Sequence, residues 1–262
     1  MIKRLVIMLA AWSCIPGLAA ADQHTTTIPH SDRNTLEFVG DAYAYDNPQQ
    51  LLYREYHTLQ LNDNGSPAKR QVDYYSPQGE LIASKINHYR NRPASASQPD
   101  FILEDYRNNY SESAEHSRDG VRLTLKENGS QAQTLVNNSD YPLVIDAGFD
   151  EFIRHHWPEL TQGDTLSFSF ASAARQTSIN FDIRARNPSA DAPLLLIMTP
   201  RSTLLSWLLD PIKLEYQRNN RQLIRYRGLS NLPDSDGDGQ QVDIRYRYFH
   251  KDSASVNTDQ PQ

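Results

Sequence analysis

Apolar and polar side chains alternate with a period of two along much of the chain. The alternation is clearest in five segments, 121–125, 166–170, 179–186, 212–216 and 242–248. Because alternate side chains of a strand point to opposite faces of a sheet, each segment is predicted to be a strand with one apolar and one wet face. This pattern is typical of antiparallel sheets, since strands buried on both faces read as continuous apolar runs.

Short turn sequences separate these predicted strands. They indicate hairpin connections at 62–65, 77–79, 118–120, 128–129 and 218–221, most of which contain Asn, Asp or Gly. About a dozen strand candidates follow from this punctuation, the first near 36–45 and the last near 241–249, with a longer loop at 89–99. We therefore expect a single β-rich domain over residues 35–250.

Two segments depart from the period of two and predict short apolar helices. In 148–160, apolar and aromatic residues recur at spacings of three and four, and Pro158 limits the helix at its C-terminal end. In 199–211, Thr199 and Pro200 are expected to open a helix and Asp210 and Pro211 to stop it. The apolar residues of this second segment are Leu204, Leu205, Trp207, Leu208 and Leu209.

The predicted fold class is mainly β: a large curved antiparallel sheet, an incomplete barrel, with two short covering helices. Two short helices do not fill the concave face of so large a sheet, so a cavity for an apolar or lipid ligand is expected there. The candidate ligand-binding residues are Trp157, Leu204, Trp207, Leu208, Phe168 and Phe181.

The first twenty-one residues have the pattern of a secretory signal peptide. Lys3 and Arg4 precede a short apolar run at 5–12, and Ala19 and Ala21 fit an A-x-A cleavage site. Cys14, the only cysteine of the chain, lies inside this segment, so the mature protein has no thiol. We expect a periplasmic protein with a flexible N-terminal segment at 22–34 and a flexible tail at 251–262.

Charge and motifs narrow the function classes. Without Lys3 and Arg4 the formal net charge changes from −6 to −8, which argues against nucleic acid as a partner. No later stretch has the roughly 18 consecutive apolar residues of a membrane-spanning helix. The chain contains no G-x-S-x-G, Walker or dinucleotide motif, so we expect a non-enzymatic protein without a cofactor.

One motif suggests a metal. Asp234, Asp236 and Asp238 alternate with Ser235 and Gly237, as in the first half of a calcium loop. The second half of the calcium-loop motif does not match, because Arg245 stands where an EF-hand needs a bidentate glutamate. Calcium binding and a solvated acidic hairpin turn are both left open.

A second polar cluster lies in the first predicted helix and comprises Asp150, Glu151, His155, His156 and Glu159. Adjacent histidines point about 100° apart on a helix, which is poor geometry for zinc. We expect Asp150 and Glu151 to favour the helix dipole, His155 to face solvent and His156 to join the apolar face.

Two stretches carry a family resemblance. Residues 144–154, with Trp157 and Leu160, and the closing segments 212–216, 223–231 and 242–246 resemble uncharacterised exported proteobacterial proteins. The closing segments also resemble periplasmic proteins related to lipoprotein carriers. That second resemblance implies an incomplete barrel closed by helices over an apolar cavity, and it assigns no functional residue.

Three functions fit these observations, and the interior of the sheet distinguishes them. A cavity lined by apolar side chains favours binding or carriage of an apolar or lipid ligand. A solid core with an exposed apolar patch favours a structural or accessory envelope protein with a protein partner. Carboxylates and histidines that converge in a cleft favour an enzyme.

The signal-peptide interpretation gives a direct prediction. N-terminal sequencing of the exported protein should find Asp22, or the residue before it, at the mature N-terminus. A retained Met1 or a lipid on Cys14 would contradict it.

Overall fold

The computed structural model describes residues 34–90, 96–137, 139–186, 192–202 and 210–249. They belong to one compact unit, Ser31–Gln262. Its first eight strands are β1 (Thr35–Ala44), β2 (Asn47–Leu61), β3 (Pro67–Tyr75), β4 (Leu81–His88), β5 (Asp100–Asp105), β6 (Tyr110–Ser117), β7 (Gly120–Glu127) and β8 (Ser130–Val136). The other seven are β9 (Leu143–Ile145), β10 (Thr165–Ser172), β11 (Thr177–Ala185), β12 (Leu194–Pro200), β13 (Ile212–Tyr216), β14 (Leu223–Leu229) and β15 (Gln241–Tyr248). Two helices, α1 (Gly148–His155) and α2 (Trp157–Gln162), follow β9.

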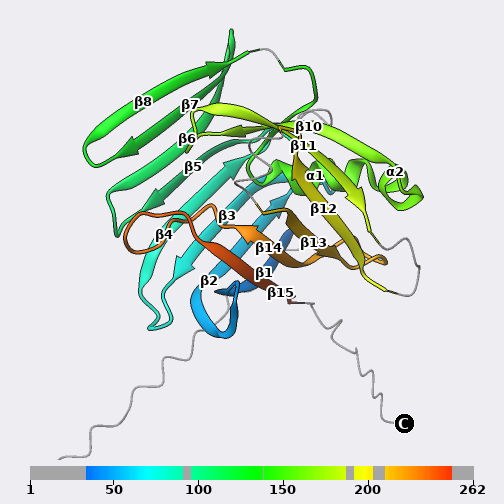
Figure 1. Cartoon of the computed structure of the whole chain (residues 1–262), viewed down its shortest axis with the longest axis horizontal. Helices are drawn as coiled ribbons and strands as arrows, with labels where there is room; N and C mark the ends of the chain where they lie inside the picture. The colour runs from blue at the N-terminus through cyan, green and yellow to red at the C-terminus, as the bar shows by residue number, and fades with distance from the viewer. Residues whose placement is uncertain (1–33, 91–95, 138, 187–191, 203–209, 250–262) are drawn as a thin grey trace, which may run out of the picture. The chain divides into compact units, whose positions relative to one another are not determined.

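All fifteen strands belong to one sheet, in the order β8-β7-β6-β5-β4-β3-β2-β1-β15-β14-β13-β12-β11-β10-β9. Every neighbouring pair is antiparallel except β9 and β10. The chain thus runs outward from β1 to one edge of the sheet, crosses to the other edge and returns to pair β15 with β1 (Figure 1). β8 contacts β11, but no ladder joins the two edge strands, so the sheet is not closed. The predicted fold class is confirmed.

The core has two parts. One lies on the inner face of β1 to β7 and includes Val72, Leu103, Leu123 and Leu232. The other lies between the helices and β10 to β14; its buried side chains include Phe152, Trp157, Leu160, Phe168, Leu196 and Leu214. The helices therefore cover the inner face of the C-terminal half of the sheet (Figure 1).

The first predicted helix is two helices in the structure. α1 ends at His155, and Pro158 stands in the first turn of α2 instead of ending the helical segment. Proline is compatible with a first turn because the N–H it lacks has no partner inside a helix there. His155 is exposed, as expected. Asp150 lies in the first turn of α1, but its side chain is buried and not solvated.

The second predicted helix is wrong at its start. Thr199 and Pro200 are the last residues of β12, where Thr199 pairs with Asp182 and Pro200 with Phe181. Residues 203–209, which include Leu204, Trp207 and Leu208, lie outside the described residues.

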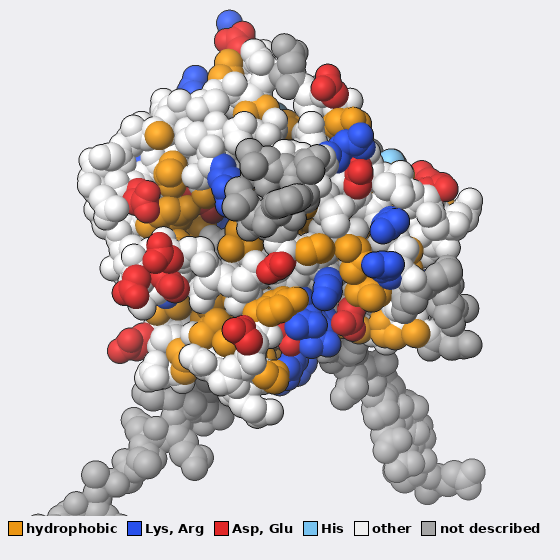
Figure 2. Space-filling model, in the orientation of Figure 1, with side chains coloured by type: hydrophobic (Ala, Val, Ile, Leu, Met, Phe, Trp, Pro, Cys, Tyr) orange, Lys and Arg blue, Asp and Glu red, His pale blue; other side chains and the backbone are white. Residues whose placement is uncertain are grey.

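The outer face of the central strands is charged. Asp41 accepts hydrogen bonds from Arg54 and Arg247, and Asp243 accepts two from Arg225 at 2.8 and 2.7 Å. Figure 2 shows basic side chains, with acidic ones among them, gathered over the region of β14 and β15. These pairs mark the solvent-facing side of the sheet, in agreement with the alternation in 242–248.

Trp157 and His155 give a stability prediction, because they lie two residues apart in opposite surroundings. Trp157 is 7% exposed in the core between the helices and the sheet, and His155 is exposed. Trp157→Ala should lower the free energy of unfolding by about 3–5 kcal/mol. His155→Ala should change it by less than about 0.5 kcal/mol. Urea denaturation measures both, and equal losses would contradict the burial of Trp157 and the exposure of His155 in this helical segment.

Candidate functional site

The inner face of the N-terminal half carries charged side chains in register. His57 of β2 lies opposite Val72, Val72 opposite Lys85, and Lys85 opposite Leu103. Leu103 in turn lies opposite Glu112 of β6. Since directly paired residues share a face, these five side chains form one row across β2 to β6.

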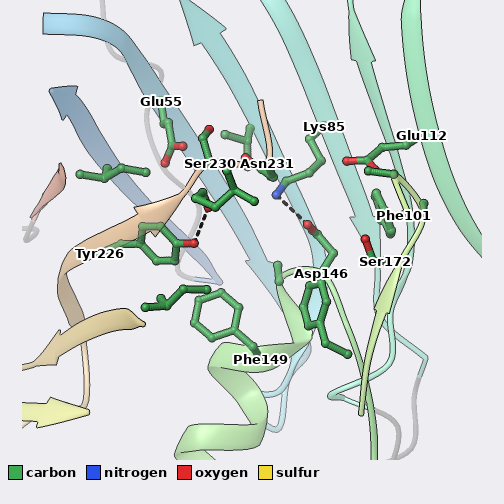
Figure 3. A pocket seen from close by; sticks show the side chains of 18 of the residues that line it. Glu55, Lys85, Phe101, Glu112, Asp146, Phe149, Ser172, Tyr226, Ser230 and Asn231 are labelled. Carbon is green, nitrogen blue, oxygen red and sulfur yellow. Dashed lines mark hydrogen bonds and ion pairs between the residues drawn. The ribbon is translucent and has the colours of Figure 1, made fainter. Parts of the chain in front are cut away.

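A cavity of about 530 Å³ lies against this row, within the size range of small-molecule sites. Its apolar lining includes Phe101, Phe149, Phe170, Ile179, Phe181 and Tyr226. Its charged lining includes Glu55, Arg70, Lys85, Glu112, Asp146 and Asp150. In Figure 3, Lys85 and Asp146 meet in the cavity wall, Tyr226 of β14 lies to their left, and Phe149 of α1 lies lower in the view. The cavity is therefore amphipathic.

Asp146, in the turn before α1, holds that turn against β4. Its carboxylate accepts hydrogen bonds from Lys85 Nζ at 3.1 Å and from Asn87 Nδ2 at 2.7 Å. Burial alone would raise the pKa of Asp146, but Lys85 and Asn87 hold it below its ordinary value. The aspartate adopts φ of 40°, a left-handed conformation that Asp tolerates better than most residues.

Asp150, four residues later, joins both halves of the sheet to α1. It accepts hydrogen bonds from Arg70 of β3 at 3.2 Å and from the Tyr216 hydroxyl of β13 at 2.9 Å, and it pairs with Arg154 of α1. Burial opposes its charge, yet Arg154 and Arg70 lower the pKa of Asp150 below its ordinary value. The carboxylate therefore stays ionised in a buried position.

Glu55 and His57 lie side by side on β2. His57 Nε2 donates to a Glu55 carboxylate oxygen at 2.9 Å, and the Tyr246 hydroxyl donates to the same oxygen at 3.2 Å. Burial lowers the pKa of His57 despite the neighbouring carboxylate, so the ring is neutral at pH 7. With its proton on Nε2, Nδ1 is an acceptor, and this buried atom has no hydrogen-bond partner.

Glu112 differs from Asp146 and Asp150, because its pKa is raised and not lowered. Burial, and then repulsion by Asp146, raise its pKa from 4.5 to about 7, against the opposing effect of Lys85. In Figure 3 its side chain points toward the Lys85–Asp146 pair. Glu112 therefore changes charge near neutral pH.

The acidic loop at 234–239 lies at the rim of this cavity. Asp234 Oδ1 accepts the backbone N–H groups of Asp236 and Asp238, both at 2.9 Å, so this carboxylate closes the turn itself. Among the described residues, no group of three or more His, Cys, Asp or Glu is placed to hold a metal ion. The side chains of Asp234, Asp236 and Asp238 thus form no calcium cage here.

The whole loop between β14 and β15, residues 230–240, crosses the concave face of the sheet. Leu232 is fully buried in the N-terminal core, and Arg107 Nη2 donates to the Pro233 carbonyl oxygen at 2.7 Å. Ser230 Oγ lies 2.8 Å from the Tyr53 hydroxyl. The β14–β15 loop is therefore a strap from the central strands to β2 and the β5–β6 turn.

The predicted ligand-binding residues are only partly at the cavity. Phe181 lines it, whereas Phe168 and Trp157 are buried in the core beside it. Phe168 stacks on Phe181 and meets Phe152 at a tilted angle, and Trp157 packs edge-on against Tyr216. Both are packing residues in this structure.

Of the charged lining, the sequence analysis singled out only Asp150, and it placed that residue at a helix end and not in a cavity. In 53–59, every second residue faces inward, and two of these four inner residues are Glu55 and His57. The signal that could have revealed these two residues is the same alternation with a period of two. It is hard to recognise here, because this segment has polar residues on both faces of the strand. Charged residues at strand positions that face the interior of a sheet are candidates for a functional site.

Comparisons with known proteins add little. No protein-family model matches the chain, and no curated protein matches it. A crystal structure of a beta-barrel-like protein of domain of unknown function DUF1849 from Brucella abortus is similar, at 6% sequence identity and a TM-score of 0.41. The similarity covers 82% of this chain and 97% of that chain. At this distance it carries no argument about function.

None of the helices in the described part of the chain is long and apolar enough to cross a membrane.

Glu112 makes stability depend on pH in a defined direction. Its folded-state pKa of about 7 lies above 4.5, so the folded state binds its proton more tightly than the unfolded chain does. The contribution of Glu112 to stability therefore falls as pH rises from about 4.5 to about 7. Glu112→Gln should be more stable than wild type at pH 8, by up to about 3 kcal/mol, and this gain should shrink toward pH 5.

Urea denaturation at both pH values measures this effect. Glu115→Gln, an exposed position on the same strand, is the matched control and should change stability little at either pH. A Glu112→Gln variant less stable than wild type at pH 8 would mean that the ionised carboxylate holds the fold together.

Proposed function

We propose that this is a non-enzymatic periplasmic protein that binds an amphipathic, lipid-like ligand in the concavity of its sheet. The observation that carries the proposal is the cavity of about 530 Å³ between the charged row of β2 to β6 and the apolar side chains of α1, β10 and β11. A cavity of this kind, with a few polar groups in an apolar wall, is the usual form of a small-molecule site.

The arrangement of the charged groups favours binding over catalysis. Asp146 is engaged by Lys85, and Asp150 by Arg70 and Tyr216, so these carboxylates position α1 against the sheet. Glu55 is the acceptor for both His57 and Tyr246. Groups held by one another in this way define the shape and polarity of a pocket.

The cavity also favours a ligand over the accessory-protein alternative, which expects a solid core and an exposed apolar patch. The most exposed large apolar side chains of the described residues are spread over four strands, the β5–β6 turn and the position after β15: Tyr56, Leu81, Ile102, Tyr106, Leu135 and Phe249. Scattered apolar residues of this kind are normal for a protein surface.

Binding of a neutral apolar dye tests the proposal. N-phenyl-1-naphthylamine should show saturable fluorescence enhancement with the delipidated wild-type protein. Ser172→Trp, which places a bulky side chain in the cavity, and Phe149→Asp, which places a charge in its wall, should each weaken binding at least about tenfold.

Ile102→Asp is the matched control, because Ile102 is 43% exposed on β5 and does not line the cavity. It should bind the dye like wild type, and circular dichroism should show the same sheet content for all four proteins. Absence of saturable dye binding to the wild-type protein would refute the proposed function.

A further inference from the structure

Both buried cations of the cavity are already paired with carboxylates of the protein. Lys85 Nζ lies 3.1 Å from Asp146, and Arg70 lies 3.2 Å from Asp150. Both basic side chains are less than a tenth exposed. Arg175, the other Lys or Arg of the described lining, is exposed in the β10–β11 turn. An acidic ligand would therefore have to displace a carboxylate of the protein before it could pair with a buried cation.

The two glutamates of β2 and β6 that line the cavity already have hydrogen-bond donors. Each accepts from two groups of the protein, which are His57 and Tyr246 for Glu55, and Tyr110 and the Ala174 backbone for Glu112. Glu55 lies on β2 and Glu112 on β6, with the Lys85–Asp146 pair between them, so one ammonium group does not reach both. A cationic ligand would therefore gain little from these carboxylates in return for the hydration that it loses.

The rest of the lining is apolar or carries neutral polar groups. Its apolar wall includes Phe149 of α1 and Phe181 of β11. Ser172 of β10 and Ser230 and Asn231 of the strap add hydroxyl and amide groups, and Figure 3 shows all three around the cavity. Such side chains both donate and accept hydrogen bonds, so they can bind a hydroxyl or ester group that brings no charge.

We propose that the cavity selects a lipid whose polar group is uncharged, such as a long-chain alcohol or a glycerol ester, over a fatty acid or an aliphatic amine of the same chain length. The inference rests on the proposed function and adds its ligand class. An ion that enters a buried site loses its hydration, and only an opposite charge that is free to pair with it compensates for this loss. A hydroxyl group loses far less, because neutral side chains can replace its hydrogen bonds to water.

Competition against the dye tests this selection with dodecanol, dodecanoate and dodecylamine, each below its micelle concentration. At pH 6.5 both ionisable compounds are charged, whereas Glu112, with a pKa of about 7, is mainly protonated. Dodecanol should displace the dye from the wild-type protein at an at least about tenfold lower concentration than either ion.

The Lys85–Asp146 pair allows the selectivity to be changed in both directions, which the greater hydrophobicity of the alcohol alone would not allow. Lys85→Met leaves Asp146 without its cation, so dodecylamine should gain at least about tenfold relative to dodecanol. Asp146→Asn combined with Glu112→Gln leaves Lys85 without either neighbouring carboxylate, so dodecanoate should gain by a similar factor. Asparagine suits the left-handed backbone at position 146.

Glu112→Gln alone is the reference for the double variant, because the difference between the two isolates Asp146. Asp100→Asn is the matched control: it removes the carboxylate partner of Arg90, and neither residue of that ion pair lines the cavity. It should keep the wild-type order of the three compounds. Circular dichroism should show the same sheet content for every variant.

The outcomes separate this inference from the proposed function. A wild-type protein from which either ion displaces the dye as well as dodecanol does would keep its lipid-binding cavity and lose the uncharged ligand. Ion-to-alcohol ratios that respond to neither change at the Lys85–Asp146 pair would also overturn the inference, because the paired charges would then not set the selection. If one of these variants does not fold, the other and the wild-type series still decide. A wild-type protein that binds no dye at all would refute both the inference and the proposed function.

Discussion

The structure depends on how one short helix is held inside a curved sheet. Asp146 and Asp150, four residues apart, fix α1 to Lys85 of β4 and Arg70 of β3, and Asp150 reaches Tyr216 on the opposite half of the sheet. Buried ion pairs are weak evidence for stability, because desolvation offsets their attraction. Removal of one partner nevertheless leaves a buried charge, so these pairs specify where the helix lies.

The position of α1 divides the concave face into two different environments. Towards β10 to β14, side chains such as Phe152 and Phe168 pack into a continuous core with α2. Towards β2 to β6, the inner face carries long charged side chains that must meet partners at fixed distances. Such side chains do not interdigitate as aliphatic ones do, and the space between the two halves stays open as the cavity.

The sequence is informative where one face of a strand is apolar and the other charged, as in 179–186 and 242–248, and both segments are strands in the structure. It is misleading where both faces are polar. In β2 the inner residues Glu55 and His57 look no different from the outer ones, and only strand pairing reveals which side they face. The predicted end of the first helical segment was wrong for a related reason. Pro158 was expected to end a helix, but proline is equally compatible with a first turn, and here it begins α2.

The buried carboxyl group of Glu112 connects the stability of this fold to the chemistry of its cavity. The pKa of Glu112 lies at about 7 because its carboxyl group is buried and is repelled by Asp146. A ligand that binds only the folded protein stabilises it by mass action, and an uncharged ligand that excludes water from the cavity would also raise the pKa of Glu112. Occupancy and protonation would then reinforce each other. A buried glutamate that lowers stability above neutral pH breaks a local rule of folding, and such breaks are most often found at functional sites.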